Sequence, residues 1–423
     1  MDRKTNYDVI IVGGGFTGTA AAIAAARGGA KTLILEQSGA LGGAAVNCLI
    51  NPFMSWWTNI DTEGGKERFY LSRGIFKEIC DKLASAGALH GNTFHEEYLK
   101  LILDGMVKEE GVNVLFHATL CGVEKDGDTL KSVAVITKSG KITFTAHTFI
   151  DCTGDADLAV MAGCPYHLGR EDGLCQPMTL CFRVANVDEE LFWSRGSLQK
   201  MQEIYSRWQQ EGKTSNPREN ILVFKTLVKG VIHFNTTRVI KLDPVDPFDV
   251  TDAEIEARKQ MLEVFTMLKE ELEAFKDAQL LTSGAWIGAR ESRMIDGEHL
   301  LTENELKDCT RFPDAIAAGN YDIDIHSPDG SGTSHYYFPD GQYYTIPYRS
   351  LIPKNADNLL VAGRCISSTH EAQASYRIMP IVCCLGEAAG VAAAECVKNN
   401  CGTRQADINE IQKTLTDSGA FIG

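Results

Sequence analysis

Short apolar runs and a helical pattern alternate at the start of the chain. Residues 8–12 (DVIIV) are a run of apolar, mostly β-branched positions without alternation, which is typical of a strand buried on both faces of a parallel sheet. Residues 19–27 are rich in alanine and predict a helix that packs close to the sheet, and Gly28 and Gly29 end it. Residues 31–35 predict a second strand of the same kind. The order of strand, helix and strand indicates an α/β fold.

Glycines occupy the turn between the first predicted strand and the helix. Gly13, Gly15 and Gly18 match the pattern G-x-G-x-x-G, and Glu36 ends the second strand. Gly13 permits a tight turn, Gly15 lets backbone N–H groups approach a pyrophosphate, and Gly18 allows close contact between helix and strand. A carboxylate at position 36 accepts hydrogen bonds from a ribose diol and disfavours a 2′-phosphate. The motif therefore predicts a site for FAD or NAD rather than NADP, and alone it does not separate those two.

Further glycine turns follow apolar runs later in the chain. Leu41-Gly42-Gly43 lies directly behind the second predicted strand, where a longer cofactor such as FAD needs backbone clearance. Residues 148–155 and 358–364 each predict a strand followed by a glycine, and each returns the chain to the same sheet. No second G-x-G-x-x-G follows a strand, so we expect no dedicated NAD(P)H domain.

Residues from about 166 to 344 separate the two parts of the predicted nucleotide domain and predict an inserted cap. Thr251 and Glu254 fit a capping box, and a long amphipathic helix is predicted to follow it as far as about Lys276. We interpret its apolar stripe as core or inter-domain packing rather than as a partner-binding face. The stripe consists of Ile255, Leu262, Phe265, Leu268, Leu272 and Phe275.

Composition and charge argue against several classes of protein. The 423 residues are 44% hydrophobic and 23% charged, which is globular composition. The net charge of −15, without a run of five basic residues, disfavours nucleic acids and anionic membranes as partners. Thirteen cysteines without CxxC pairs indicate reduced thiols, a cytoplasmic location and no metal site. Glycines within residues 9–26 argue against a membrane span there, and we expect no other stretch to be long and apolar enough.

Several segments together carry a family resemblance. They are the first glycine motif, Leu41-Gly42-Gly43, residues 149–155, residues 176–179, residues 290–293, residues 346–351 and the block 358–390. With them the chain resembles the two-dinucleotide-binding-domain flavoproteins, and more closely the bacterial FAD-dependent oxidoreductase family, which is distantly related to fumarate reductase-type flavoproteins. The resemblance implies a glutathione reductase-type, Rossmann-like FAD-binding domain, formed by residues 1–165 and 345–423. An α+β cap or substrate domain at residues 166–344 is inserted into it.

The resemblance also implies which positions meet FAD. Glu36 would bind the adenosine ribose, and Leu120 would meet the adenine through its backbone. The N-terminus of a helix at residues 380–398 would point at flavin N1 and O2, where its dipole favours negative charge on the reduced flavin. The full set of expected FAD-binding positions is Gly13, Gly15, Phe16, Thr17, Gly18, Glu36, Gln37, Gly42, Gly43, Leu120, Gly154, Asp155, Gly363, Arg364, Ile378 and Met379.

Candidate catalytic residues stand immediately before that last helix. His370 and Glu371 are candidates for acid–base work, because a flavin supplies its own hydride chemistry and needs from the protein a proton donor or acceptor. For His370 the alternative is a hydrogen bond to the flavin or the backbone. We expect Arg377 either to clamp a substrate carboxylate or to form a structural ion pair with Glu371 or Glu291.

Other polar groups have a weaker pattern. Arg290, Glu291 and Arg293 predict a buried Arg–Glu network that joins the cap to the nucleotide domain rather than catalysis. On a predicted cap strand, His233 and Asn235 would face one cavity. The sequences around residues 322–326, 334–337 and 343–344 are interpreted as a pocket rim, with surface loops as the alternative. Cys48 has no second cysteine at the spacing of a dithiol reductase.

The resulting hypothesis is an FAD-dependent oxidoreductase. It would transfer a hydride between flavin N5 and a small polar organic substrate, by oxidation of a CH–OH or CH–NH centre or by the reverse reaction. The alternatives are a flavin-dependent ene reductase of an unsaturated acid and a flavin-binding electron-transfer subunit. Electrons would enter or leave through the substrate, a diffusing NAD(P)H, a protein carrier or O₂. The sequence leaves open whether the protein forms a homo-oligomer.

Overall fold

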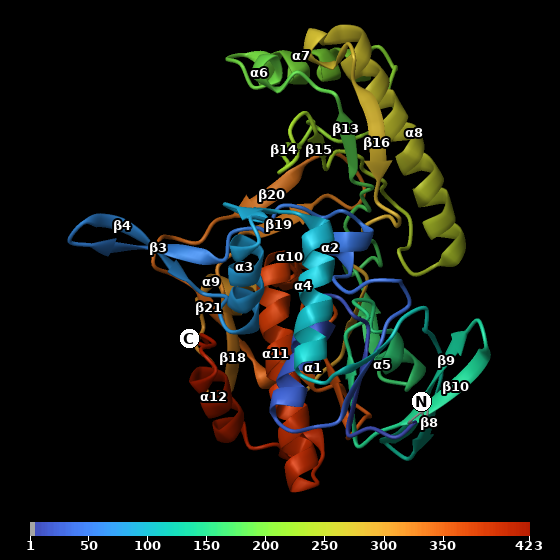
Figure 1. Cartoon of the computed structure of the whole chain (residues 1–423), viewed down its shortest axis with the longest axis vertical. Coiled ribbons are helices and arrows are strands. Elements are labelled where there is room, and N and C mark those ends of the chain that lie inside the picture. Colours follow the sequence, from blue (N-terminus) through green and yellow to red (C-terminus); the bar gives the residue numbers. More distant parts are fainter. Residues whose placement is uncertain (1–4) are drawn as a thin grey trace.

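The computed structural model describes residues 5–423 and is built around a five-stranded parallel sheet (Figure 1). The strand order is β22-β11-β1-β2-β7. The strands are β1 (Val9–Val12), β2 (Thr32–Leu35), β7 (Asn113–Leu115), β11 (Thr148–Asp151) and β22 (Leu359–Val361). Val9 of β1 pairs with Thr32 on one side and with Thr148 on the other. The predicted strands at residues 8–12 and 31–35, and those after residues 148 and 358, are confirmed, and the fold is a Rossmann-like α/β fold.

Successive side chains of the central strands enter two separate hydrophobic cores. Val9, Ile11 and Ile34 belong to the first core. Ile10 and Val12 belong to the second core, on the other face of the sheet. Because both faces are covered, every position of these strands is apolar, and this explains the lack of alternation in the sequence.

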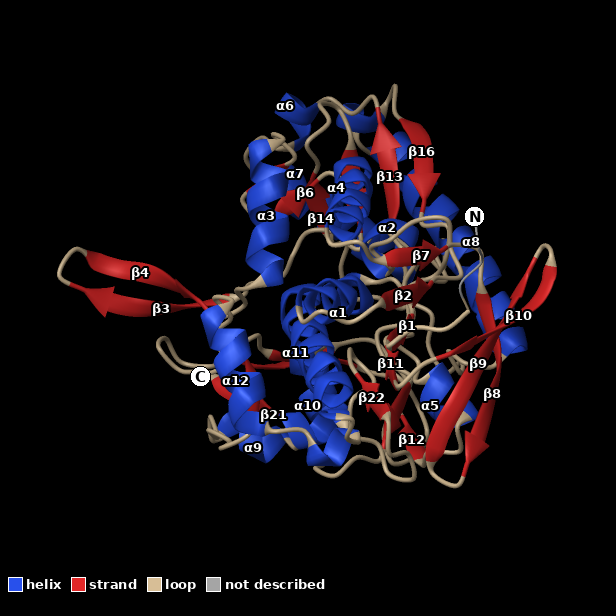
Figure 2. Ribbon diagram, turned by 60° about the horizontal axis from the view of Figure 1, so that its bottom comes forward, coloured by secondary structure: helices blue, strands red, loops and turns tan. Residues whose placement is uncertain are grey.

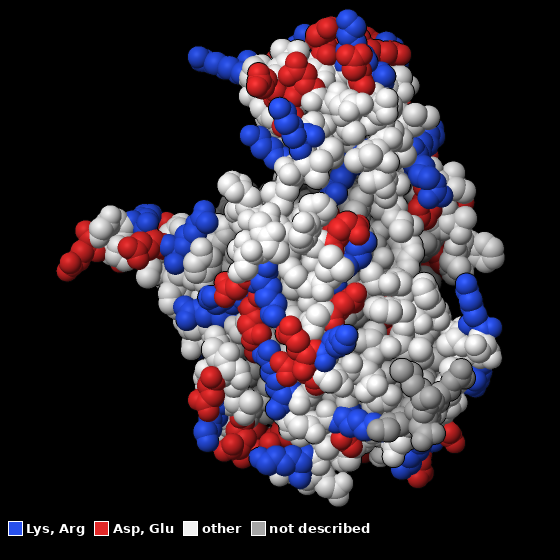
Figure 3. Space-filling model, viewed as in Figure 1, with Lys and Arg blue, Asp and Glu red and all other residues white. Residues whose placement is uncertain are grey.

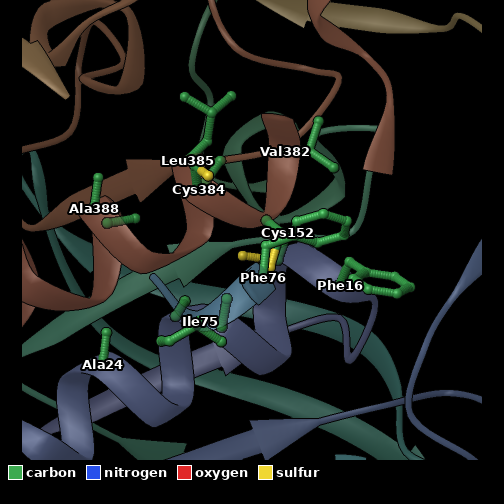
Figure 4. Close-up of a cluster of buried hydrophobic side chains, with 14 of the residues drawn as sticks. Phe16, Ala24, Ile75, Phe76, Cys152, Val382, Cys384, Leu385 and Ala388 are labelled. Carbon is green, nitrogen blue, oxygen red and sulfur yellow. The ribbon is translucent and has the colours of Figure 1, made fainter. Parts of the chain in front are cut away.

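Helices cover the first face of the sheet (Figure 2). They are α1 (Phe16–Arg27), α3 (Ile75–Ser85), α4 (Glu96–Glu109), α11 (Met379–Asn399) and α12 (Ile408–Asp417). Side chains from α1, α3 and α11 meet in one cluster (Figure 4). Glycines of α11 face the backbone of α1, so closely that a Cβ at Gly386 would overlap the carbonyl oxygen of Thr17. The two helices therefore pack at backbone contact, and α1 begins at Phe16, three residues before the predicted start.

One sequence expectation about membranes was wrong. Helix α11 has the length and, with a mean hydropathy of 1.6, the apolarity of a membrane span, although no such stretch outside residues 9–26 was expected. Of its most apolar window, 89% is buried inside the protein. A helix that is surrounded by protein on all sides needs apolar residues all round, which gives it the composition of a span.

An antiparallel sheet covers the second face. It consists of β8 (Thr119–Asp126), β9 (Thr129–Thr137) and β10 (Gly140–Thr145), in the order β10-β9-β8, and α5 (Asp157–Met161) packs beside it. Val133, Val135 and Phe144 of this sheet belong to the second core. The nucleotide domain is therefore three layers deep, with helices, parallel sheet and antiparallel sheet.

The cap has a hydrophobic core of its own and stands above the nucleotide domain in Figure 1. Its sheet has the order β14-β15-β13-β16. The elements are β13 (Phe182–Ala185), α6 (Glu189–Phe192), α7 (Ser197–Gln210), β14 (Val223–Lys225), β15 (Ile232–Phe234), α8 (Pro247–Glu271), a 3-10 turn η1 (Glu273–Phe275) and β16 (Gln279–Ser283). Phe182 and Phe234 stack at the centre, with ring centroids 4.8 Å apart.

Helix α8 begins earlier than its capping box predicted. The Asp246 side chain accepts hydrogen bonds from the N–H groups of Phe248 and Asp249, and Pro247 occupies the first turn. Thr251 lies inside the helix, where its hydroxyl donates to the carbonyl oxygen of Pro247. The predicted capping box at Thr251 is therefore wrong, because a stronger cap with Asp and Pro stands one turn upstream.

The predicted apolar stripe of this helix is wrong in its first half. Ile255 is 58% exposed and Leu262 is 57% exposed, whereas Ala253, Ala257 and Met261 are buried against the cap. The helix ends at Glu271, so Leu272 and Phe275 are buried in the turn that follows it. Two sets of apolar residues recur at helical spacing in this segment. The set that includes Ala253 and Ala257 is the one that packs against the cap.

Further elements are three strand pairs and four short helices. They form the pairs β12 (Tyr166–Leu168) with β17 (Arg293–Ile295), β18 (Ala315–Gly319) with β21 (Tyr344–Pro347), and β19 (Ile323–His326) with β20 (Thr333–Tyr336), and the helices α9 (Glu303–Lys307), α10 (His370–Tyr376), η2 (Tyr348–Leu351) and η3 (Thr403–Gln405). Leu301, Ile316 and Tyr344 belong to the first core of the nucleotide domain. Residues 301–344 thus pack with that domain, and the predicted boundaries at 165 and 344 stay predictions.

A two-stranded hairpin projects from the body (Figures 1 and 2). It consists of β3 (Trp57–Thr62) and β4 (Gly65–Tyr70), and the short elements α2 (Ala44–Asn47), β5 (Leu89–His90) and β6 (Thr93–Phe94) flank it in the sequence. On the face shown in Figure 3, basic and acidic side chains are interspersed over the body and the hairpin.

Candidate active site

The first glycine turn has no room for side chains. Gly13 has a φ of +98°, and a Cβ there would overlap the carbonyl oxygen of Cys152 at the end of β11. A Cβ at Gly18 would overlap the carbonyl oxygen of Gly13. Helix α1 starts directly after the turn, without an acidic residue in its first turn. Its first N–H groups have no acidic side chain nearby that would repel an anion, and the predicted pyrophosphate role of this turn stays a prediction.

A second glycine turn lies beside the first. The N–H of Gly42 donates to the carbonyl oxygen of Gly14 at 2.9 Å, and Gly15 and Gly42 form an isolated bridge. A Cβ at Gly43 would lie 2.8 Å from the Cα of Gly15. These two turns form a backbone wall that a long, flat cofactor can approach closely.

Glu36 is buried at the end of β2 and is 4% exposed. Its Oε2 accepts the N–H of Gly14 at 2.6 Å, and its Oε1 accepts the N–H of Ser38 at 2.7 Å. A carboxylate has further lone pairs for ribose hydroxyls, so this position fits the predicted role. Next to it, Gln37 is exposed, and Leu120 is half-buried on β8, where it pairs with Val135.

A third part of the site lies where β11 and β22 end. Arg364 Nη2 pairs with Asp155 Oδ1 at 2.6 Å, and the Ser292 hydroxyl donates to the same oxygen at 2.5 Å. A Cβ at Gly154 would lie 2.8 Å from Arg364 Nη1, and Gly363 faces Thr17 of α1. Arg364 Nε is buried without a hydrogen-bond partner in the part of the chain that the structure describes.

Helix α11 opens next to the catalytic candidates. Ile378 is its N-cap, Met379 is its first residue, and no acidic residue stands in its first turn. Its start leaves backbone N–H groups free to meet a group with negative charge. Arg377 immediately precedes this start.

His370 is held by a carboxylate from a distant segment. It is 6% exposed on α10, and its Nδ1 lies 2.7 Å from Oε1 of Glu291, which is fully buried. The other oxygen of Glu291 accepts the N–H of Gln176 at 2.9 Å. Among residues 5–423, His370 Nε2 has no hydrogen-bond partner. The adjacent Glu371 forms no ion pair or side-chain hydrogen bond with another described residue, and its catalytic role stays a prediction.

Arg377 does not form either of its two predicted ion pairs. Its Nη2 donates to the carbonyl oxygen of Asp324 at 3.2 Å and lies 3.6 Å from the Asp324 carboxylate. Glu291 is occupied by His370 and Gln176, so it is not available to Arg377. The structural pairing with Glu371 or Glu291 is therefore corrected to Asp324 on β19.

The predicted Arg–Glu network joins the same segments through other partners. Arg290 Nη1 donates to the carbonyl oxygen of Pro177 at 2.7 Å and to the Thr179 hydroxyl at 2.5 Å. Arg293 donates to the carbonyl oxygen of Asp155 and pairs with Asp157. Neither arginine pairs with Glu291, so the predicted Arg–Glu pairing is wrong, because backbone carbonyls and nearer carboxylates take its place.

Two further candidate residues from the sequence, His233 and Cys48, are buried. His233 lies inside the cap sheet with both ring nitrogens unpartnered among the described residues, and burial, with Arg183 nearby, lowers its pKa to about 3. Its neighbour Asn235 instead contacts Arg290, at 3.5 Å. Burial raises the pKa of the Cys48 thiol to about 12, so Cys48 is not a reactive thiolate.

Two charged residues of this region, Asp324 and Arg218, were not among the candidate catalytic residues from the sequence. Asp324 appeared only as part of a pocket rim, and Arg218 was not singled out. Arg218 lies between α7 and β14, is 5% exposed, and no motif marks it. Gln176 and Gln373 connect the region, with Gln176 Nε2 3.3 Å from Gln373 Oε1.

Comparison with known proteins identifies the family. A model of the family described as FAD dependent oxidoreductase matches residues 8–415. The chain belongs to this family. FAD is therefore the cofactor of this enzyme, and the glycine turns, Glu36 and the unpartnered Nε of Arg364 fit it, because they combine close backbone approach with donors for a pyrophosphate and an acceptor for a ribose.

Individual relatives are distant. Glutathione reductase of Yarrowia lipolytica is 29% identical over 192 residues, which are 44% of this chain and 40% of that protein. This chain therefore matches about two-fifths of the length of that relative. A geranylgeranyl bacteriochlorophyll reductase-like structure from Thermoplasma acidophilum has a TM-score of 0.47 at 14% identity, and the match covers 99% of this chain and 84% of that one. For p-nitrophenol 4-monooxygenase from Pseudomonas putida the TM-score is 0.48 at 11% identity, with coverage of 99% and 90%.

Within residues 5–423, no group of three or more His, Cys, Asp or Glu side chains is placed to hold a metal ion.

Proposed function

We propose that this enzyme oxidises a CH–OH or CH–NH centre of a small polar substrate, or catalyses the reverse reduction, with His370 as the proton acceptor or donor. Bound FAD supplies the acceptor or donor of the hydride. The substrate O–H or N–H must lose a proton as its carbon loses a hydride, so the oxidation needs a base beside the flavin.

The observation that carries this proposal is the buried pair of His370 and Glu291. When the Nδ1–H donates to the Glu291 carboxylate at 2.7 Å, Nε2 is left with its lone pair free to accept a proton. The carboxylate also stabilises the imidazolium that forms after proton transfer. Because Glu291 is itself fixed by the N–H of Gln176, the ring orientation is set before the substrate arrives.

The remaining residues of the site assist without moving a proton. The first turn of α11, free of acidic side chains, favours negative charge on the neighbouring group. Glu36 and the glycine turns hold the cofactor in place through contacts that do not change in the reaction. Gln373 lies between Arg290 and Arg377: its side chain donates to the carbonyl oxygen of Arg290 at 2.9 Å, and its carbonyl oxygen accepts the N–H of Arg377 at 3.2 Å.

The test is an anaerobic titration of the FAD-loaded enzyme with hydroxy acids, amino acids, sugars, enoates, NADH and NADPH, followed by flavin absorbance. A compound that bleaches the flavin names the substrate class. His370→Ala should retain FAD yet slow this bleaching by about 10²- to 10⁴-fold. His90→Ala, an exposed histidine on β5, is the matched control and should change nothing.

Two results would overturn the proposal. Unchanged flavin reduction in His370→Ala would remove His370 from the mechanism. Reduction by a protein partner alone, with no response to any small molecule, would favour an electron-transfer subunit.

A further inference from the structure

Three arginines converge between the cap and the nucleotide domain beside one buried carboxylate. Arg218 comes from the cap, Arg290 from the segment after β16, and Arg377 from the turn between α10 and α11. Asp324 on β19 is 8% exposed and is the carboxylate nearest to Arg377. The four residues come from four separate segments, which only the folded chain brings together.

Two of the three arginines, Arg218 and Arg290, make no hydrogen bond that compensates their charge. Arg290 donates to a backbone carbonyl and a hydroxyl, and Arg218 Nε donates to the amide oxygen of Asn220 at 3.4 Å. Neither forms an ion pair with a carboxylate among residues 5–423. Glu219, which follows Arg218 in the chain, is engaged by Arg238 Nη1 at 2.8 Å. Asp324, whose charge acts on both Arg218 and Arg290, lies 3.6 Å from Arg377.

The electrostatic surroundings of Arg290 are positive. Burial, together with the charges of Arg218 and Arg377, lowers the pKa of Arg290 to about 9. Burial and Arg290 also lower the pKa of His326 to about 3, so this histidine is neutral and adds no charge of its own. Uncompensated cations in a buried region are costly unless an anion joins them.

Polar atoms in this group are also left without partners. Arg377 Nε and Asp324 Oδ1 are buried and make no hydrogen bond to any residue in the described range. The side chain of Arg377 is 13% exposed, and Arg290 is half-buried. A planar guanidinium with free N–H groups binds a carboxylate through two parallel hydrogen bonds.

We propose that Arg218, Arg290 and Arg377 form the binding site for a carboxylate group of the substrate, so that the enzyme acts on a small organic acid. This inference rests on the proposed function for its chemistry, but the binding site is defined independently of it. Arg290 is adjacent in the chain to Glu291, the partner of His370, and both contact the network of Gln176 and Gln373. The acid group would therefore be anchored beside the proton acceptor.

FAD also carries negative charge, and the experiment must separate the two sources of the anion. The positions expected to contact FAD are Glu36, Arg364 and the glycine turns, whereas Arg218 belongs to the cap. If the three arginines serve FAD, their variants lose the cofactor. If they serve the substrate, the variants keep the cofactor and lose affinity for acids.

The experiment measures binding of lactate and glycolate to the FAD-loaded enzyme, each against its neutral amide, by calorimetry and by the change in flavin absorption. Binding of the acids over the amides is expected. Arg290→Gln and Arg218→Gln should each weaken acid binding by about 10- to 100-fold, the loss for one hydrogen bond to a charged group, without effect on amide binding. Arg258→Gln, an exposed arginine of the same cap, is the control.

The substitution Asp324→Asn should change the affinity for acids in the opposite direction to the arginine variants. Removal of the competing carboxylate should tighten acid binding, which a loss of folding cannot imitate. FAD content and thermal melting of each variant exclude a folding defect. Equal affinity for acids and amides, or loss of FAD without loss of acid binding in the arginine variants, would overturn the inference. Arginine-dependent acid binding without any turnover would support the inference while refuting the proposed function.

Discussion

Glu387 on α11 is a carboxyl group buried in the core, and it makes the stability of the enzyme depend on pH. It is 3% exposed, and its Oε2 accepts the N–H of Ile75 at 3.0 Å. Burial, with a smaller contribution from Glu78, raises its pKa from 4.5 to about 7, against the opposing effects of the Ile75 N–H and Arg27. The informative substitution is Glu387→Gln, which keeps the shape and an acceptor oxygen but cannot ionise.

The sign of the effect follows from the two pKa values. Between pH 4.5 and 7 the folded protein keeps the Glu387 proton that the unfolded chain has lost. The free energy of unfolding therefore falls as pH rises through this window and levels off above about pH 7. A pKa raised from 4.5 to about 7 corresponds to about 3 kcal/mol in total, at about 1.4 kcal/mol for each pH unit.

The assay is urea unfolding of the FAD-saturated enzyme at pH 5, 6, 7 and 8, for the native protein and Glu387→Gln. The difference in unfolding free energy should grow in favour of the glutamine variant by about 2.5 kcal/mol across this range, since part of the total change lies below pH 5. Glu190→Gln, an exposed change on α6, should run parallel to the native protein. Parallel curves for Glu387→Gln as well would refute the reasoning, because the carboxyl would then ionise as easily in the core as in water.

The remaining predictions concern packing, the cofactor and the cap. Gly386→Ala should destabilise the protein by about 1–3 kcal/mol in a thermal melting experiment, because the new methyl group meets the backbone of α1. Gly105→Ala on α4, where the glycine has open space around it, should stabilise the protein by about 0.5–1 kcal/mol in the same experiment. Glu36→Ala should lower FAD affinity about tenfold or more, measured as cofactor retained after gel filtration, and a variant with full yellow colour would contradict its ribose role. Asp246→Ala removes the N-cap of α8 and should lower the free energy of unfolding in urea by about 1 kcal/mol. Thr251→Ala should change it by less than about 0.5 kcal/mol. A larger loss for Thr251→Ala than for Asp246→Ala would support a capping box at Thr251 instead.

Local patterns were sufficient for the nucleotide domain. The nucleotide domain begins with strands buried on both faces, a glycine turn without room for side chains, and an acid at the end of the next strand. All of these features depend on contacts within about thirty residues. The strands and the turn were therefore predictable. Local patterns failed for α8, where two apolar faces and two caps competed, and the packing of Ala253 and Ala257 against the cap decided between them.

The α/β fold and a dinucleotide site follow from the sequence, because neighbouring residues set the backbone geometry that such a cofactor requires, and the family resemblance pointed to FAD. The partners of the catalytic candidates depend on the folded chain. His370 meets Glu291 from 79 residues away, and Arg377 meets Asp324 from 53 residues away. Spacing along the chain carries no information about such pairs, since ionic contacts depend on which segments the fold brings together and which charges burial leaves without a counterion.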